Sequence, residues 1–304
     1  MENALLEIVA AIKAGDRKLD AAWLDKLVRR HNRATHDANR KVAKRRLLPF
    51  YLGVKARDPK RWESWGIDPV TEEALLRLLK MKPRRTASGV ATITVITKPW
   101  PCSSDCLYCP NDVRMPKSYL TDEPACQRAE RNYFDPYLQV RSRLVALHEM
   151  GHVTDKIELI VLGGTWNDYP REYQLWFVSE LFSALNEAEP GADGAASAAG
   201  EPAAPPAVAD TPEQRDRRYR ACGLTYDLAE LQASTSELQR QVNEGTCTYN
   251  QAIAQLNGRA SWQQASAWQW ATLEDLRRQH ITNETAAHRV VGLCIETRPD
   301  LITT

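Results

Sequence analysis

The sequence of 304 residues predicts an α/β fold built around a parallel sheet. Three runs rich in β-branched residues, 91–97, 156–162 and 290–295, predict strands. Segments with helical apolar spacing, 125–150 and 170–188, follow the first and the second of them. Strands that alternate with helices form a parallel sheet or a barrel, and the chemistry of such folds gathers at the carboxyl ends of the strands.

The N-terminal part of the chain predicts helices without strands. Apolar residues recur at helical spacing over 4–14 and over 20–30. A further helix is expected over 71–80, with Thr71 as its N-cap and acidic residues in its first turn. We therefore expect a helical region in front of the α/β core.

Composition and charge exclude several classes of protein. The formal net charge is +1 and the mean hydropathy is −0.48. The longest apolar stretch, 157–162, is interrupted by Glu158, whereas a transmembrane helix needs about 20 apolar residues. The N-terminus has no cationic segment before an apolar one, so we expect a cytoplasmic protein without a membrane partner. Seven cysteines, an odd number, argue against a disulfide framework.

The near-zero net charge hides a basic segment from Lys26 to Arg61. This segment contains thirteen Lys and Arg residues, and only Asp37 and Asp58 oppose them. A segment of this charge attracts a polyanion through the release of counterions. The segment predicts contact with nucleic acid. The alternative, which the charge alone supports equally, is a helical face exposed to solvent.

The composition changes abruptly after the helix predicted over 170–188. Of the 25 residues from Ala188 to Pro212, 18 are Ala, Gly or Pro, which predicts a disordered linker. Residues 213–282 are rich in Gln, have helical spacing and predict an insertion within the core. The expected domains are 1–82 (helical and basic), 83–188 (first part of the core), 189–282 (linker and helical insertion) and 283–304 (continuation of the core).

The cysteines Cys102, Cys106 and Cys109 follow the first predicted strand with the spacing C-x3-C-x2-C. Three thiolates on one short loop can each bind one iron of a [4Fe–4S] cluster and leave the fourth iron open. S-adenosylmethionine (SAM) can chelate an open iron, and electron transfer from the cluster then yields a 5′-deoxyadenosyl radical. Tyr108, just before the last cysteine, is the kind of aromatic residue that a radical-SAM loop prefers at this position.

The turn Gly163-Gly164-Thr165 ends the second predicted strand. In radical-SAM enzymes a glycine-rich turn at this place receives the amino group of SAM on its backbone. Two adjacent glycines also end ordinary strands, so the motif gains its weight from its position one βα unit after the cysteines. In that position it supports the cluster interpretation.

Two zinc sites compete with this interpretation. The first is a structural site of the loop cysteines with Cys126 or His148 as the fourth ligand, although such sites prefer paired C-x2-C knuckles. The second uses His148 and His152, which match the H-E-x-x-H signature of zinc peptidases. The helix predicted over 125–150 is expected to end at Gly151, so the two histidines need not share a helical face. We therefore favour the cluster over both zinc sites.

Motifs along the α/β core resemble one known family in order and spacing. The matching segments are Pro83–Val90, Lys98-Pro99, the cysteine loop, Ser118-Tyr119, Glu123-Pro124, Arg128-Ala129, Asp135–Gln139, Gly151–Lys156, Gly163–Thr165, Pro170–Tyr173 and Ile295–Asp300. Together they resemble the catalytic subunit of Elongator and its single-chain bacterial and archaeal counterparts. The resemblance covers about 83–187 and 283–304.

The resemblance implies a radical-SAM partial (β/α) barrel fused to a GNAT-type acetyltransferase domain, acting on the wobble uridine of tRNA. In that reaction the deoxyadenosyl radical takes hydrogen from the acetyl group of acetyl-CoA. The carbon radical adds to C5 of uridine, and hydrolysis leaves 5-carboxymethyluridine. The basic segment Lys26–Arg61 would then correspond to a tRNA-binding region.

The resemblance also assigns roles to individual residues by motif match. Cys102, Cys106 and Cys109 would hold the [4Fe–4S] cluster, and Tyr108, Gly163, Gly164 and Thr165 would line the SAM site. Lys156 would contact acetyl-CoA. Glu296 and Arg298 would face the active site from the end of their strand.

The chain departs from the family pattern in three places. The family has a longer gap between the first two cysteines, and Gly-Gly where Asn111-Asp112 stands here. The chain stops at Thr304, after part of the barrel and without an acetyltransferase domain. We expect a truncated radical-SAM barrel whose remainder a second chain would supply. A radical-SAM enzyme with another substrate, and a non-catalytic tRNA-binding or assembly fragment, are the alternatives.

Overall fold

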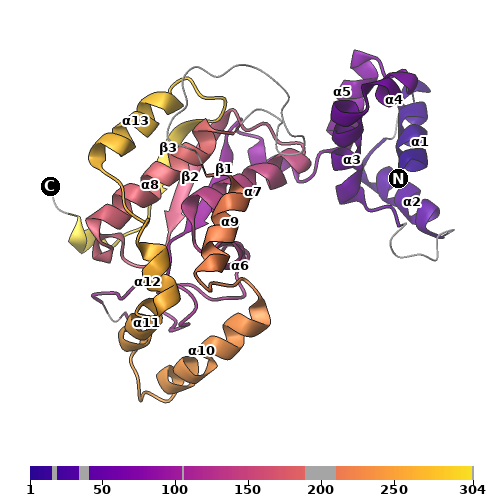
Figure 1. Ribbon diagram of the computed structural model, residues 1–304. Coiled ribbons are helices and arrows are strands. Elements are labelled where there is room, and N and C mark those ends of the chain that lie inside the picture. The colour runs from indigo at the N-terminus through magenta and orange to yellow at the C-terminus, as the bar shows by residue number, and fades with distance from the viewer. Residues whose placement is uncertain (16–18, 34–40, 105, 189–209, 303–304) are drawn as a thin grey trace. The chain divides into compact units, whose positions relative to one another are not determined.

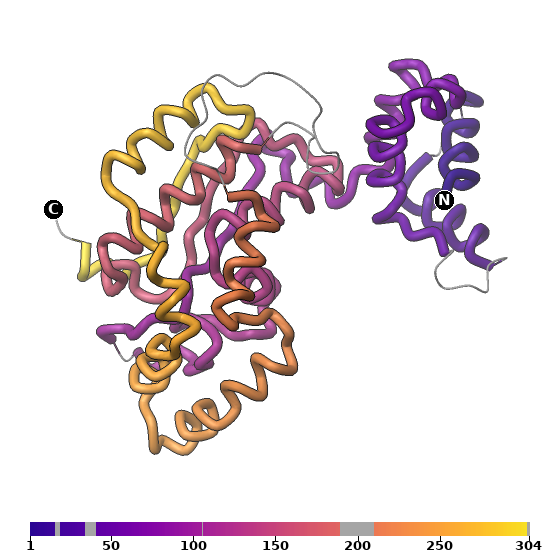
Figure 2. Tube along the Cα trace, viewed as in Figure 1, coloured from indigo at the N-terminus to yellow at the C-terminus, as the bar shows by residue number. Residues whose placement is uncertain are grey.

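The computed structural model describes residues 1–15, 19–33, 41–104, 106–188 and 210–302 (Figures 1 and 2). The chain divides into two compact units. The first unit contains Met1–Ala91 and Leu144–Thr154, and the second contains the other described residues. The linker predicted from residue 189 lies outside the described residues up to 209. The predicted domain boundaries therefore stay predictions.

The first unit is helical in its described residues, as the apolar spacing predicts. Its helices are α1 (Glu2–Lys13), α2 (Ala21–Arg33), α3 (Lys44–Arg57), α4 (Pro59–Ser64) and α5 (Pro69–Leu79), followed by the 3₁₀ turn η2 (Pro83–Thr86). Their apolar faces meet in one core, in which Leu5, Leu24, Leu47, Tyr51 and Leu75 are fully buried. Burial of these side chains is the main favourable contribution to the fold of this unit.

The N-cap of helix α5 lies three residues before the predicted one. Asp68 is the N-cap, and its carboxylate accepts hydrogen bonds from the backbone N–H groups of Val70 and Thr71, both at 3.0 Å. The prediction of Thr71 as the N-cap is wrong, because Pro69 occupies the first helical position and leaves Asp68 in front of it. The hydroxyl and backbone hydrogen bonds from Thr71 lower the pKa of Asp68.

The second unit contains a sheet of three strands in the order β1-β2-β3, which confirms the α/β prediction. The strands are β1 (Ala91–Ile96), β2 (Lys156–Leu162) and β3 (Arg289–Ile295). β2 and β3 are parallel, from Lys156 beside Arg289 to Val161 beside Ile295. β1 runs in the same direction, because Thr92 bonds to Glu158 near one end and the Thr97 N–H donates to the Leu162 carbonyl at the other.

Helices follow each strand of the sheet. After β1 come α6 (Pro124–Arg131) and α7 (Pro136–Glu149), and after β2 come η3 (Trp166–Asp168) and α8 (Arg171–Asn186). α13 (Leu273–Asn283) precedes β3, and η4 (Pro299–Leu301) follows it. The helical region expected over 125–150, in which Asp135-Pro136 indicates a break, consists of two helices, and Tyr133 and Phe134 adopt positive φ between them. α8 and α13 lie side by side in Figure 1, and the rings of Phe182 and His280 are 4.3 Å apart.

Before α13, with which it ends, the predicted insertion forms four further helices in its described residues. They are α9 (Pro212–Ala221), α10 (Leu228–Asn243), α11 (Tyr249–Asn257) and α12 (Ala260–Ser266). Thr211 and Thr248 form capping boxes at α9 and α11, and Asp227 caps α10. Figure 1 shows α11 and α12 beside the loop that follows β1. The helical prediction for this segment is confirmed.

A buried carboxylate joins the insertion to the core. Asp135 is fully buried and accepts hydrogen bonds from the Leu138 N–H at 2.9 Å and from the Tyr219 hydroxyl at 2.8 Å. Arg215 lies 3.5 Å from the same carboxylate and pairs with Glu180 at 2.5 Å. Residues of α9 thus neutralise a charge that the core buries at the start of α7.

We predict that Asp135→Ala destabilises the second unit by about 3–5 kcal/mol, because it leaves Arg215 and the Tyr219 hydroxyl without their buried partner. Urea denaturation followed by tryptophan fluorescence measures the loss. The control is Asp227→Ala, which removes an exposed cap and costs about 1 kcal/mol. Equal losses for the two variants would contradict an anchoring role for Asp135.

Candidate functional site

The first predicted ligand lies where the loop leaves the sheet. Cys102 is buried, and its Sγ lies 3.4 Å from Oγ1 of Thr165. The next residue, Ser103, donates its backbone N–H to the carboxylate of Asp168 at 2.8 Å. The loop after β1 and the turn after β2 are therefore in direct contact, as the parallel sheet predicts.

The rest of the cysteine loop projects into solvent. Cys106 is exposed, and Leu107 and Tyr108 are 91% and 95% exposed. Cys109 is half-buried, with its Sγ 3.2 Å from Oγ of Ser118. Exposed apolar side chains at the tip of a loop are unfavourable unless a ligand or another part of a protein packs against them.

The donor set fits the predicted cluster in its chemistry. All seven cysteines lie in the described residues and are free thiols, so Cys102, Cys106 and Cys109 are available as thiolates. Within the described part of the chain no three Cys, His, Asp or Glu side chains gather into a group that could hold a metal ion. Binding of a cluster therefore requires the exposed part of the loop to fold in towards Cys102.

The glycine turn is shaped by a close approach between strand ends. A Cβ on Gly163 would lie 1.9 Å from Oγ1 and 3.2 Å from Cβ of Thr97, so any other residue there would force the Thr97 side chain or the strand end to shift. The Thr97 hydroxyl also hydrogen-bonds to the hydroxyl of buried Tyr169 at 2.7 Å. A Cβ added at Gly164 would meet its nearest neighbours only at 3.9 Å, so this position has more room than Gly163.

Two further predicted residues lie at the same edge of the sheet. Glu296 follows β3 and accepts a hydrogen bond from the hydroxyl of Tyr119, and together with burial it raises the pKa of Tyr119 above its ordinary value. Arg298 pairs with Asp300, which raises the pKa of Arg298.

Lys156 is separated from these residues. It is exposed at the amino end of β2, whereas the glycine turn follows the carboxyl end of the same strand. A strand rises about 3.3 Å per residue, so about 20 Å separate Lys156 from Leu162. The structure does not bring Lys156 to the cysteine loop, and its role towards acetyl-CoA stays a prediction.

A buried lysine near the site, Lys98, lies in one of the matching segments but was given no role from the sequence. The Lys98 ammonium donates to Gln269 Oε1 at 2.7 Å and to Ser266 Oγ at 3.2 Å, and it lies over the ring of Tyr173. These partners are neutral, and burial lowers the pKa of Lys98 to about 8. The available signal was a lysine placed directly after a predicted strand that ends in the cysteine loop.

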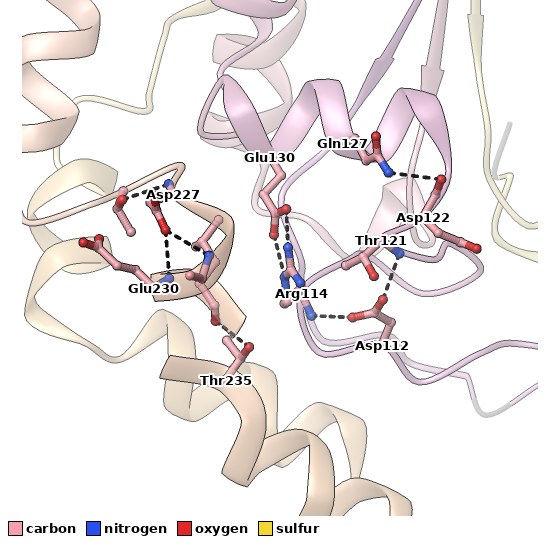
Figure 3. A network of polar contacts seen from close by, with 12 residues as sticks. Asp112, Arg114, Thr121, Asp122, Gln127, Glu130, Asp227, Glu230 and Thr235 are labelled. Carbon is pink, nitrogen blue, oxygen red and sulfur yellow. Dashed lines mark hydrogen bonds and ion pairs between the residues drawn. The ribbon is translucent and has the colours of Figure 1, made fainter. Parts of the chain in front are cut away.

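A compact polar network holds the segment after the cysteine loop (Figure 3). Asp112 accepts backbone hydrogen bonds from Arg114 at 3.0 Å and from Thr121 at 2.9 Å. The Arg114 guanidinium pairs with buried Glu130, with Nε 2.8 Å from Oε1. A cavity of about 280 Å³ lies between this network and the insertion, and Trp262 forms part of its lining.

The zinc-peptidase alternative fails on local geometry. α7 ends at Glu149, and Gly151 adopts a φ of +80°. The His152 N–H donates to the Leu147 carbonyl at 3.0 Å, which closes the helix, and its Nδ1 is bonded to the Thr86 hydroxyl at 2.8 Å. The two histidines of the motif therefore do not share a helical face.

The basic segment of the first unit is partly paired with acids. The ion pairs join Arg30 to Glu7, Arg61 to Glu2, Lys55 to Glu72 and Lys44 to Asp25. Exposed basic residues include Lys41, Arg45 and Arg46. Residues 34–40 of the segment lie outside the described residues. Contact of the exposed part of the segment with nucleic acid stays a prediction.

None of the helices in the described residues has the length and apolar character needed to span a bilayer.

We predict that the free energy of unfolding of the second unit rises with pH between about 8 and 10 through Lys98. The folded-state pKa of Lys98 lies below the ordinary value of 10.5, so the unfolded state binds more protons in this range. Protonation therefore stabilises the unfolded state, and this stabilisation is lost as pH rises. The difference in slope between wild type and Lys98→Met, measured by urea denaturation, should approach about 1.4 kcal/mol per pH unit. Parallel pH profiles would contradict a buried charged lysine.

Comparison with curated proteins finds relatives of one kind. The chain is 44% identical over 124 residues to the tRNA uridine(34) acetyltransferase of Methanocaldococcus infernus, covering 39% of this chain and 23% of that protein. It is 34% identical over 176 residues to the protein of the same name from Dehalococcoides mccartyi, covering 58% and 35%. It is 39% identical over 132 residues to Elongator complex protein 3 of Homo sapiens, covering 40% and 24%.

The chain thus spans about a quarter to a third of the length of the curated relatives it matches. No family model matches it. Among solved structures, the archaeal Methanocaldococcus infernus Elp3 with an N-terminal deletion aligns with 70% of this chain and 24% of that chain, at 24% identity and a TM-score of 0.32. A superposition this loose supports no structural argument.

Proposed function

The chain is a relative of the tRNA uridine(34) acetyltransferases and of Elongator complex protein 3, and from this premise we propose that it is the radical-SAM part of a cytoplasmic enzyme that forms 5-carboxymethyluridine at the wobble position of tRNA. One observation supports the proposal most directly. The Cys102 thiol lies 3.4 Å from the Thr165 hydroxyl, so the first cysteine of the motif and the glycine turn are in contact.

Cys102, Cys106 and Cys109 are the proposed ligands of a [4Fe–4S] cluster. When bound, the cluster would supply the electron that cleaves SAM to a 5′-deoxyadenosyl radical. The contribution of the chain is to present three thiolates beside the glycine turn. Cys102 is already placed there, and the exposed segment that carries Cys106 and Tyr108 is free to cover the site.

The neighbouring residues would bind and orient SAM. A Cβ added at Gly164 would meet nothing closer than 3.9 Å, so this position is less crowded than Gly163, and we assign the amino group of SAM to this turn. Glu296, held by the Tyr119 hydroxyl, provides a fixed acceptor at the end of β3. Arg298 can bind a carboxylate or phosphate, since its present partner Asp300 is exposed.

The substrates and partners follow from the same proposal. The exposed part of the basic segment Lys26–Arg61 would bind the tRNA phosphates. Acetyl-CoA would be the source of the added carbons and would meet Lys156 at the other end of β2. β3 forms an edge of the described sheet, with Val291 56% exposed, and a further strand from a second chain could pair there.

We predict that Cys102→Ala, Cys106→Ala and Cys109→Ala each abolish cluster assembly. Anaerobically reconstituted wild type should bind about four irons and four sulfides and give a reduced EPR signal that SAM perturbs. The control is Cys222→Ala in the insertion, which should match wild type. A loop variant that keeps its full iron content, or stoichiometric zinc without sulfide in wild type, would refute the assignment.

We predict that Arg45→Glu combined with Arg46→Glu weakens tRNA binding and lowers the salt dependence by about one counterion per lost phosphate contact. The control carries the same charge change at two exposed positions of the second unit, Arg217→Glu with Arg277→Glu. Filter binding at several salt concentrations gives both slopes. Equal slopes for the two double variants would assign the basic segment to a solvated face. Binding of tRNA without cleavage of SAM would favour a non-catalytic fragment.

A further inference from the structure

The insertion contacts the backbone of the first predicted cluster ligand. The Asn250 side chain, in α11, accepts a hydrogen bond from the Cys102 N–H at 2.9 Å and donates to the Cys102 carbonyl at 2.8 Å. One amide group thus satisfies both backbone groups of one residue, as a neighbouring strand would. This pairing fixes the orientation of the Cys102 peptide units and thereby of its side chain.

The insertion also holds the strand end that leads into the loop. Asn257, in the last turn of α11, donates from Nδ2 to the Pro99 carbonyl at 3.2 Å. Gln269 and Ser266 accept from the buried Lys98 ammonium. Several polar partners of the segment from Lys98 to Cys102 are therefore residues about 150 to 170 positions later in the chain, beside those that Asp168, Tyr169 and Tyr173 supply.

The segment that leaves the loop is held in the same way. The Gln239 side chain accepts from the Val113 N–H at 2.9 Å and donates to the Asn111 carbonyl at 3.0 Å. The Tyr249 hydroxyl donates to the Met115 carbonyl at 2.7 Å. Val113 also packs in an apolar cluster with Ile253 and other residues of α10 and α11.

Both ends of the cysteine loop are thus fixed while its tip, with exposed Cys106 and Tyr108, is not. A site that must collect three thiolates gains from having one of them placed in advance, because less conformational entropy is lost on binding. The only α11 side chain that bonds directly to a predicted ligand in the described residues is Asn250.

We propose that Asn250 is a positioning residue that holds Cys102 against Thr165 before the cluster assembles, and that the insertion serves as the support of the cysteine loop. This rests on the proposed function in one respect, since Cys102 is a ligand only if the loop binds a cluster. The backbone pairing itself is a property of the protein without its cofactor.

The first experiment measures thiol alkylation in the cluster-free full chain, resolved by cysteine with mass spectrometry. Asn250→Ala should raise the alkylation rate of Cys102 about tenfold, through loss of two hydrogen bonds that oppose local opening. Asn250→Asp should raise it less, because the carboxylate still accepts from the Cys102 N–H. The matched control is Gln255→Ala on an exposed position of the same helix.

Buried Cys126 reports on global unfolding in the same samples. It packs in a different apolar cluster, with Met115 and Phe134, so selective opening of the loop leaves its rate unchanged. If Asn250→Ala exposes Cys126 as well, the milder Asn250→Asp decides. Faster alkylation of Cys102 with Cys126 still protected supports the positioning role, and an unchanged Cys102 rate overturns it.

The second experiment reads the cofactor-bound state without relying on turnover. After anaerobic reconstitution, Asn250→Ala should bind less iron and sulfide than Gln255→Ala and give an EPR signal that SAM perturbs less. A variant that equals the control in both measurements would overturn the support role. If wild type binds no cluster, the proposed function fails, whereas the alkylation rates still decide whether Asn250 positions Cys102.

Discussion

The close parallel alignment of β1 and β2 is the constraint on which the candidate site depends. At Gly163 the backbone of one strand end approaches Oγ1 of Thr97 so closely that a Cβ would lie at 1.9 Å. Because of this approach, the turn after β2 reaches the loop after β1, and Thr165 meets Cys102. A side chain at 163 would force the Thr97 side chain or the strand ends to shift, and a shift of the strand ends would separate Cys102 from Thr165.

Two of the attachments between the insertion and the core serve different ends. At Asp135 a buried carboxylate obtains its partners from Arg215 and Tyr219, so α9 compensates a charge in the core. At Cys102 no strand pairs with the backbone N–H and carbonyl groups, and the Asn250 side chain hydrogen-bonds to both. The core and the insertion therefore fold as parts of one unit, in agreement with the division of the chain.

Local patterns in the sequence predicted the elements well. β2 has the predicted bounds, because alternating apolar residues are bounded by a turn, and β1 and β3 agree within one residue. Errors arose where two local signals competed. Asp68 and Thr71 are both good caps, and only Pro69 at the first helical position distinguishes them. α3 was not predicted as a helix, because Pro49 and the run of basic residues obscure its apolar face.

The parts of the site that the sequence did not predict are those that depend on contacts distant in the chain. Motifs placed Cys102 and Gly163–Thr165 at neighbouring strand ends, since parallel strands bring their carboxyl ends together. The pairing of Asn250 with Cys102 joins residues 148 positions apart, and no periodicity or spacing carries that information. For the same reason four helices beside the cysteine loop were interpreted only as an insertion.

Lys98 shows why this insertion is more than an addition to the core. An ammonium group buried without acceptors would cost several kcal/mol or lose its proton. Its two hydrogen-bond acceptors, Ser266 and Gln269, both come from the segment around the end of α12. Without that segment the lysine at the end of β1 would need water in their place, and water at this point would open the start of the cysteine loop. The buried charge in the core and the helices of the insertion thus depend on each other, and the order of the loop depends on both.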